Sequence, residues 1–261
     1  LILVGIAGGG GGADTDTSLD IWTSVKNEVM FEQAIENDIS GFLLSYTFSR
    51  DNGYLEEDDR ERIKDYITDS MCVLDNGENR FLTLQEILEK VASSNDEMYE
   101  EFVDTLKINF SFEPTQDGKY PYPLEQFSIT SMYGERQNPT GNGTRFHNGM
   151  DLVGSEPYAP IISITDGDVV NTNTNKSGLG NYVIIKYIDE TGVFYGVYGH
   201  MSGLLVNVGD EVEEGEVIGL QGGDPDVDPN AGDTTGRHLH FEIRQRAFSS
   251  SSSVDPAEYI M

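Results

Sequence analysis

The residues best suited to chemistry in this chain are its four histidines and one nearby aspartate. All four histidines fall in three short motifs: His147 with Asp151 in FHNGMD, His200 in VYGHMS, and His238 with His240 in TGRHLHFEI. Histidine supplies neutral nitrogen ligands for zinc and general acid–base groups near neutral pH. The placement of every histidine in such motifs predicts that the chain is built around one metal site.

The HLHFEI segment predicts a strand with one apolar and one polar face. Strand alternation separates Leu239, Phe241 and Ile243 from His238, His240 and Glu242. A rise of about 3.3 Å per residue puts the two histidine Cα atoms roughly 6.6 Å apart. One ring could therefore bind a metal while the other reaches a water molecule on that metal.

The FHNGMD motif adds a carboxylate to the histidines. His147 and Asp151 are four residues apart and could share a face in a helix or a strand. Gly149 disfavours a helix, and the apolar Leu152 and Val153 predict a strand that starts at about Asp151. A histidine pair alone would be read as ordinary polar residues of a strand face. Four histidines with a well-spaced carboxylate favour a metal site instead.

The elements that must position these side chains are predicted to be antiparallel strands. Short β-rich runs such as YVIIKY and VFYGVYGH alternate with turns rich in Gly, Asn and Asp. No helical pattern of 10–15 residues follows residue 120, which argues against a parallel α/β sheet. The stretch VNVGDEVEEGEVIG is similar to the hairpin of lipoyl and biotinyl carrier domains. A carrier needs a lysine at the hairpin tip and Val206–Gly219 has none, so this similarity predicts topology only.

Several further motifs occur together with the histidine motifs. They are ITSMYGER, GSEPYAPIISITDGDVV, GLGNYVIIKY and VNVGDEVEEGEVIGLQG. In this order, and with FHNGMD, YGH and TGRHLHFEI, residues 119–261 resemble the M23 (lysostaphin or LytM-type) zinc metallopeptidases, which cut peptide bonds in peptidoglycan.

This resemblance implies a role for each residue of the constellation. The family's zinc ligands fall on His147, Asp151 and His240, and its catalytic histidines fall on His200 and His238. Two histidines and a carboxylate leave a fourth position open on zinc, as in catalytic sites. We expect His238 to act as the general base and His200 to stabilise the oxyanion or protonate the leaving amine, although the sequence does not fix this division.

The predicted function is a zinc-dependent endopeptidase that acts on peptidoglycan peptides outside the cytoplasm. The alternative is a non-catalytic protein of the M23 fold that binds the wall or serves as a scaffold or activator. Such a protein would be expected to lack a ligand, and here all five residues are present. The sequence leaves open the bond that is cut, whether a glycine cross-bridge or a D-Ala–diamino-acid link. It also leaves open the oligomeric state and the process served, whether division, wall remodelling, lysis, phage entry or conjugation.

The predicted fold class is α+β, with a small N-terminal helical domain followed by an all-β peptidase domain. Residues 1–18 form an apolar and glycine-rich leader, read as a linker or as the end of a membrane anchor upstream of residue 1. Residues 19–112 are predicted to form a helical module, 113–122 a linker and 123–261 the peptidase domain. The seven apolar residues LILVGIA are too few to span a bilayer, which needs about 20.

The helical module shows apolar stripes at helical spacing and carries no catalytic pattern. The stripes include Trp22, Val25 and Val29; Ile63, Tyr66, Ile67 and Met71; and Tyr99, Phe102, Val103 and Leu106. Thr83 and Glu86 form a candidate capping box ahead of another stripe. The function of this module is not apparent from its sequence, and one hypothesis is that it restrains the peptidase.

The amino-acid composition of the chain restricts the kinds of partner and ligand that it is expected to bind. The chain has 46 acidic and 16 basic residues, a net charge of −30, so nucleic acid is not an expected partner. Cys72 is the only cysteine and excludes an intrachain disulfide. Two acidic loops, residues 75–86 and 224–233, lack the glycine of an EF-hand and are not expected to bind calcium. The second loop precedes the HLH strand and is predicted to line one end of the substrate groove.

Overall fold

The computed structural model describes residues 24–25, 27–29, 60–75, 78–93, 96–137, 143–156 and 158–261. The chain divides into two compact units between Lys90 and Val91. The predicted leader, residues 1–18, lies outside the described residues, as does Trp22. Within the described ranges, no helix is long and apolar enough to cross a membrane.

The first unit combines helices with a β-hairpin. Its elements are α3 (Arg60–Tyr66), a π-helical turn (Ile67–Met71), β1 (Cys72–Asp75), β2 (Glu78–Phe81) and α4 (Leu84–Ala92), which begins in this unit. The segment predicted as a helical module therefore also contains two strands, β1 and β2, which pair antiparallel. Their register runs from the pair Cys72–Phe81 to the pair Asp75–Glu78.

The capping box at the start of α4 is confirmed. The backbone N–H of Glu86 donates to Thr83 Oγ1 at 3.2 Å, and the backbone N–H of Thr83 donates to Glu86 Oε2 at 2.8 Å. Arg80 adds two hydrogen bonds of 2.7 Å to the same carboxylate. Glu86 is thus held at the start of α4 by both its capping partner and Arg80.

The second unit begins with α5 (Asp96–Phe110), which buries Phe102, Val103 and Leu106 as the spacing predicted. Lys107 Nζ lies 2.7 Å from Glu216 Oε1, which ties α5 to the segment before β12. The strands that follow are β3 (Phe127–Ser131), β4 (Gly134–Gln137), β5 (Thr144–His147), β6 (Met150–Gly154), β7 (Pro160–Ile162), β8 (Gly167–Asn173), β9 (Asn181–Asp189), β10 (Gly192–Leu204), β11 (Glu211–Val212), β12 (Val217–Gln221), β13 (Leu239–Arg244) and β14 (Ser253–Val254), and the chain ends with α6 (Ala257–Ile260).

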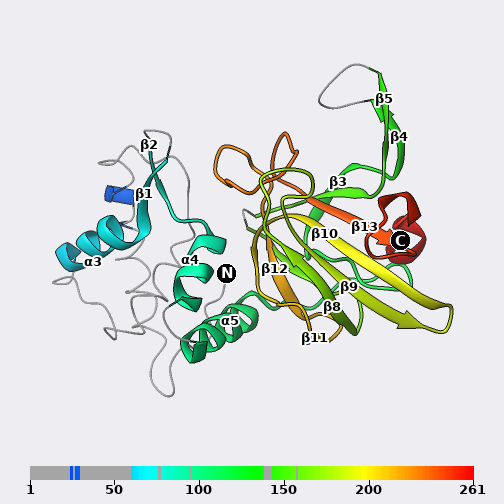
Figure 1. Ribbon diagram of the computed structural model, residues 1–261, viewed down its shortest axis with the longest axis horizontal. Coiled ribbons are helices and arrows are strands. Elements are labelled where there is room, and N and C mark those ends of the chain that lie inside the picture. Colours follow the sequence, from blue (N-terminus) through cyan, green and yellow to red (C-terminus); the bar gives the residue numbers. More distant parts are fainter. Residues whose placement is uncertain are drawn as a thin grey trace. The chain divides into compact units, whose positions relative to one another are not determined.

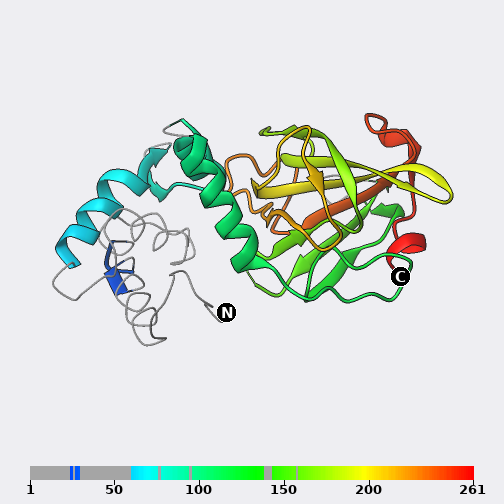
Figure 2. The same ribbon diagram turned by 90° about the horizontal axis from the view of Figure 1, so that it is seen from below.

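The strands form one antiparallel sheet and a separate hairpin, which confirms the predicted antiparallel β architecture of this part of the chain. The main path of the sheet is β11-β8-β9-β10-β13-β6-β3, with β12 pairing with β10 and β7, and β14 pairing with β13. β4 and β5 pair only with each other, and Figure 1 shows this hairpin projecting beyond the end of β3. Figure 2 shows α5 leading directly into the segment that runs along the sheet to β3.

The apolar face of β13 packs in the core, so the polar side chains of this strand lie on its opposite face. Leu239, Phe241 and Ile243 are completely buried in the hydrophobic core. Because side chains alternate along a strand, His240 and Glu242 point to the opposite face. In the register of the sheet His240 lies beside Asp151 of β6 on one side and Gly199 of β10 on the other. Pairing of β13 with β6 thus brings together the FHNGMD and HLH motifs, whose histidine and aspartate residues are at least 87 positions apart, and pairing with β10 adds the strand that carries His200.

Candidate metal centre and active site

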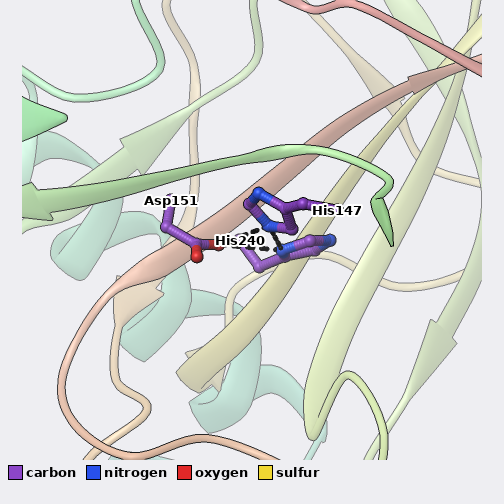
Figure 3. Close-up of side chains that lie close together, drawn as sticks. All are labelled: His147, Asp151 and His240. Atoms are coloured by element: carbon purple, nitrogen blue, oxygen red, sulfur yellow. Dashed lines mark hydrogen bonds and ion pairs between the residues drawn. The ribbon is translucent and has the colours of Figure 1, made fainter. Parts of the chain in front are cut away.

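Three side chains converge at the site as the sequence predicted: His147, Asp151 and His240 (Figure 3). His147 Nε2 lies 3.1 Å from His240 Nδ1 and 3.0 Å from Asp151 Oδ1, and His240 Nδ1 lies 2.9 Å from the same oxygen. All three residues are buried, and among the described residues they form the only such group of histidine, cysteine and carboxylate ligands.

In both His147 and His240, the ring nitrogen that points away from the cluster lies within hydrogen-bond distance of an oxygen acceptor. His147 Nδ1 lies 2.9 Å from the carbonyl oxygen of Met132. A carbonyl can only accept, so Nδ1 carries a proton, and Nε2 is the nitrogen that faces His240 and Asp151. His240 Nε2 lies 2.9 Å from Glu242 Oε1, which leaves His240 Nδ1 as its metal-facing nitrogen. Such outer partners orient a histidine ligand and increase its basicity.

The electrostatics of the cluster favour a positive charge at its centre. Burial opposes ionisation of Asp151, but hydrogen bonds from His147 and His240 hold the pKa of its carboxyl well below the usual range. Burial also opposes protonation of His240, yet its hydrogen bonds to Asp151 and Glu242 raise the pKa of the ring to about 9. The two carboxylates thus stabilise a proton at His240 Nδ1, or a metal cation in its place.

The donor set fits zinc. Nitrogen and oxygen ligands about 2.0–2.1 Å from a tetrahedral zinc lie about 3.3 Å from one another. The three donor atoms here are 2.9–3.1 Å apart, which is close to that spacing. Two histidines and one carboxylate form a set typical of catalytic zinc, which keeps a fourth position for water or substrate.

His200 and His238 lie beside this cluster without joining it. The ring centroids of His200 and His238 are 4.7 Å apart, and His238 Nε2 lies 3.6 Å from Asp151 Oδ1. His200 Nδ1 donates to the carbonyl oxygen of Ala231 at 2.7 Å, and His238 Nδ1 donates to that of Gly236 at 2.8 Å. Each ring therefore has an Nε2 lone pair that can accept a proton.

Burial keeps both of these rings neutral. Burial, reinforced by the neighbouring His238 and His240, lowers the pKa of His200 to about 3. Burial is also the main reason that the pKa of His238 is lowered, although Asp151 acts in the opposite direction. A neutral imidazole near neutral pH can serve as a proton acceptor.

An irregularity in β10 aims His200 into the site. The register of β10 against β9 shifts between Tyr198 and Met201, and His200 has a positive φ of 58°, which is rare for a residue other than glycine. Because the bulge breaks strand alternation, Tyr198 does not share the direction of His200. Tyr198 is completely buried, and its hydroxyl hydrogen-bonds Tyr187 at 2.7 Å, so it packs in the core rather than reaching the cleft.

The histidines open into a cavity of about 410 Å³. All five predicted site residues line it, and Asp233, Thr234 and Thr235 line it as well. The prediction that the loop at residues 224–233 reaches the groove is therefore confirmed at its last residue, Asp233.

Sequence reasoning gave no role to three charged residues of the site. Glu242 holds His240, and Arg244 Nε in turn donates to Glu242 Oε2 at 2.6 Å. Arg136 Nη1 donates to Asp151 Oδ2 at 2.7 Å from the β4–β5 hairpin. Strand alternation already placed Glu242 on the histidine face. The contact of Arg136 depends on how the hairpin folds back, which no local pattern signals.

Part of the chain is similar to known proteins. Residues 145–256 match the family model of Peptidase family M23. Lysostaphin of Staphylococcus simulans is 32% identical over 128 residues, which are 49% of this chain and 24% of that protein. The peptidoglycan DD-endopeptidase ShyA of Vibrio cholerae is 34% identical over 124 residues, 47% of this chain and 26% of that protein. The solved catalytic domain of Staphylococcus simulans lysostaphin covers 50% of this chain and 90% of its own, with 30% identity and a TM-score of 0.42.

The matched segment is thus an M23 metallopeptidase domain, a family whose cofactor is zinc, and His147, Asp151 and His240 form the cluster that fits this metal. The chain spans only about a quarter to a third of the length of the first curated relatives that it matches.

Proposed function

We propose that this chain is a zinc-dependent endopeptidase that hydrolyses peptide bonds in bacterial peptidoglycan. The observation that carries the proposal is the convergence of three zinc-type ligand atoms beside two histidines that are not ligands. A purely structural zinc site would be closed by a fourth protein ligand and would need no proton-accepting neighbours. The relatives named for action on peptidoglycan supply the substrate class.

The chain's own residues divide the work of hydrolysis. When bound, zinc polarises the scissile carbonyl and makes a water molecule more acidic. His238 is proposed as the general base, because its free Nε2 faces Asp151 Oδ1 of the ligand cluster and its ring is neutral. His200 is proposed to take up a proton at Nε2 during the reaction, and in that form to stabilise the negative oxygen that develops on the carbonyl or to pass the proton to the leaving amine.

The proposed place of action is outside the cytoplasm, because peptidoglycan lies there. Attachment by a membrane anchor upstream of residue 1 rests on the apolar run LILVGIA alone. Restraint of the peptidase by the residues before it is a further part of this proposal.

Mass spectrometry of purified peptidoglycan after incubation with the full chain tests the function. New peptide amines that form with zinc, and that are missing with a chelator or with the His238→Ala variant, would establish the hydrolase. Their masses would also identify the bond. If several wall types yield no products while zinc is shown to be bound, the chain is a non-catalytic wall-binding or scaffold protein.

A further inference from the structure

Among the described residues that line the cavity, one arginine forms no ion pair. Three arginines line it: Arg136, Arg145 and Arg244. Arg136 is paired with Asp151, and Arg244 is paired with Glu242. Arg145 is exposed on β5, and no carboxylate of the described residues forms an ion pair with it.

The register of the hairpin places a second positive charge beside Arg145. Arg136 of β4 and Arg145 of β5 are direct cross-strand partners. Side chains directly opposite in an antiparallel pair lie on the same face, and like charges in such positions repel each other. Both line the cavity, so this pair is aimed at the space in which a substrate would lie.

This position is unusual in so acidic a chain. Basic residues number 16 against 46 acidic ones, and an arginine left unpaired at a catalytic cavity is not part of a generally basic surface. Arg136 is offset by Asp151, but Asp151 is also a predicted zinc ligand. A dication that shares Asp151 leaves this corner of the cavity with an excess of positive charge.

We propose that Arg145, with Arg136 beside it, binds an ionised carboxylate of the substrate next to the scissile bond. Guanidinium groups match carboxylates through two parallel hydrogen bonds, which gives both strength and orientation. The proposal rests on the proposed function and narrows it. A peptide that carries a free carboxylate beside the cleaved bond is preferred, whereas a run of glycines has no side-chain carboxylate for this position.

The test uses two synthetic peptidoglycan-type peptides that differ in one group beside the scissile bond, a free carboxylate in one and a carboxamide in the other. The full zinc-loaded chain should cleave the carboxylate peptide with a KM about tenfold or more below that of the amide. Arg145→Gln should raise KM for the carboxylate peptide by about tenfold to a hundredfold, as expected for loss of a charge-assisted hydrogen bond. The same variant should leave KM for the carboxamide peptide unchanged. The KM of Arg145→Lys for the carboxylate peptide should lie between those of the parent chain and Arg145→Gln, because lysine keeps the charge but lacks the planar guanidinium.

Arg246→Gln is the matched control, because it removes the same charge from an exposed position that does not line the cavity. Equal KM values for the two peptides with the unmodified chain would overturn the proposal. So would an equal rise in KM for both peptides with Arg145→Gln. Binding of both peptides is also measured by calorimetry in the His238→Ala background. If neither peptide is cleaved, the proposed function is wrong, and the binding preference alone decides the role of Arg145.

Discussion

Each histidine of this protein has one nitrogen committed to the scaffold and one directed into the site. Backbone carbonyls hold Nδ1 of His147, His200 and His238, so all three present Nε2. His240 differs, because Glu242 holds its Nε2 and it presents Nδ1. The two histidines proposed as zinc ligands therefore offer different ring nitrogens, and their hydrogen-bond partners within the protein set this difference.

The ligand and base roles predict different losses on truncation to alanine. His240→Ala removes one of three donors and should lose zinc and hydrolysis together. His238→Ala leaves the three donors in place and should keep stoichiometric zinc while its kcat falls by about 10²–10⁴-fold, the usual contribution of a general base. Metal content by atomic emission and turnover on the same preparations measure both effects. Full activity of His238→Ala would show that the base is another residue.

Glu242 is predicted to tune the metal through His240. Glu242→Gln keeps the size of the side chain but removes the negative charge that accepts from His240 Nε2 and from Arg244 Nε. Replacement of such an outer partner typically costs 10–100-fold in metal affinity or activity, so zinc affinity should fall by about that factor. Competition with a chromogenic chelator measures it. An unchanged zinc affinity would mean that the charge of Glu242 does not tune the metal site through His240.

The residue types of the site could be predicted from the sequence, but their supporting contacts could not. Motif spacing and strand alternation placed His238, His240 and Glu242 on one face. The carbonyl of Ala231 that orients His200 is a backbone group, so no residue type marks it in the sequence. The direction of Tyr198 could not be predicted for the same reason, because a bulge in β10 is set by pairing with β9 and is not visible in the alternation of β10 itself.

At the scale of elements, the loop between β12 and β13 positions His200. Ala231 accepts from His200 Nδ1, and the backbone N–H of Ala231 donates to the carbonyl of Asp228 at 3.0 Å. Asp228 is buried, and its Oδ1 has no hydrogen-bond partner. Burial is the main cause that raises the pKa of Asp228 to about 7, while backbone N–H groups of Asp224 and Gly223 act against it.

This buried carboxyl predicts a pH dependence of stability. Between about pH 4 and 7 the folded state holds a proton on Asp228 that the unfolded chain has released, so the free energy of unfolding decreases as pH rises through that window. The slope is at most about 1.4 kcal/mol per pH unit. Asp228→Asn stays neutral and should remove this component, so the variant gains stability relative to the parent chain up to about pH 7. Urea unfolding at several pH values measures it.

Asp226→Asn is the matched control, because Asp226 is exposed in the same loop. It should leave the pH dependence as it is in the parent chain. If Asp228→Asn is destabilised equally at pH 5 and pH 8, the carboxyl is needed for its shape and hydrogen bonds and does not carry the proton described above.

At the scale of the whole molecule, the sheet carries its own core. The residues of the core cluster around β13 all lie between Tyr120 and Ile260, and α5 contributes none of them. The boundary between the two compact units nevertheless lies between Lys90 and Val91 in the sequence, so α5 belongs to the same unit as the sheet. The separation at residues 112 and 113 stays a prediction, since similar apolar stripes in neighbouring helices do not show which core each helix joins.

A fragment of residues 113–261 is therefore predicted to fold and bind zinc without the preceding residues. It keeps the complete core cluster and all five site residues, and it loses the ion pair between Lys107 and Glu216. A partly exposed pair of this kind contributes about 0–1 kcal/mol, so its loss should have little effect. Cooperative thermal unfolding and one zinc per chain are the measurements. A fragment without a cooperative transition would show that α5 is part of the folding unit.

The same fragment decides whether the residues before it, the first unit together with α5, restrain the peptidase. A segment joined to the sheet by a short connection acts at an effective concentration in the millimolar range, so even weak affinity for the cavity would keep it occupied. If the restraint exists, fragment 113–261 should cleave peptidoglycan peptides faster than the full chain, and the difference should lie mainly in KM, because an occupied cavity competes with substrate. Adding the isolated residues 1–112 in trans should then inhibit the fragment only at high concentration. Equal kcat and KM for the two chains would assign the N-terminal residues a role outside regulation of this site, such as placing the peptidase at the wall.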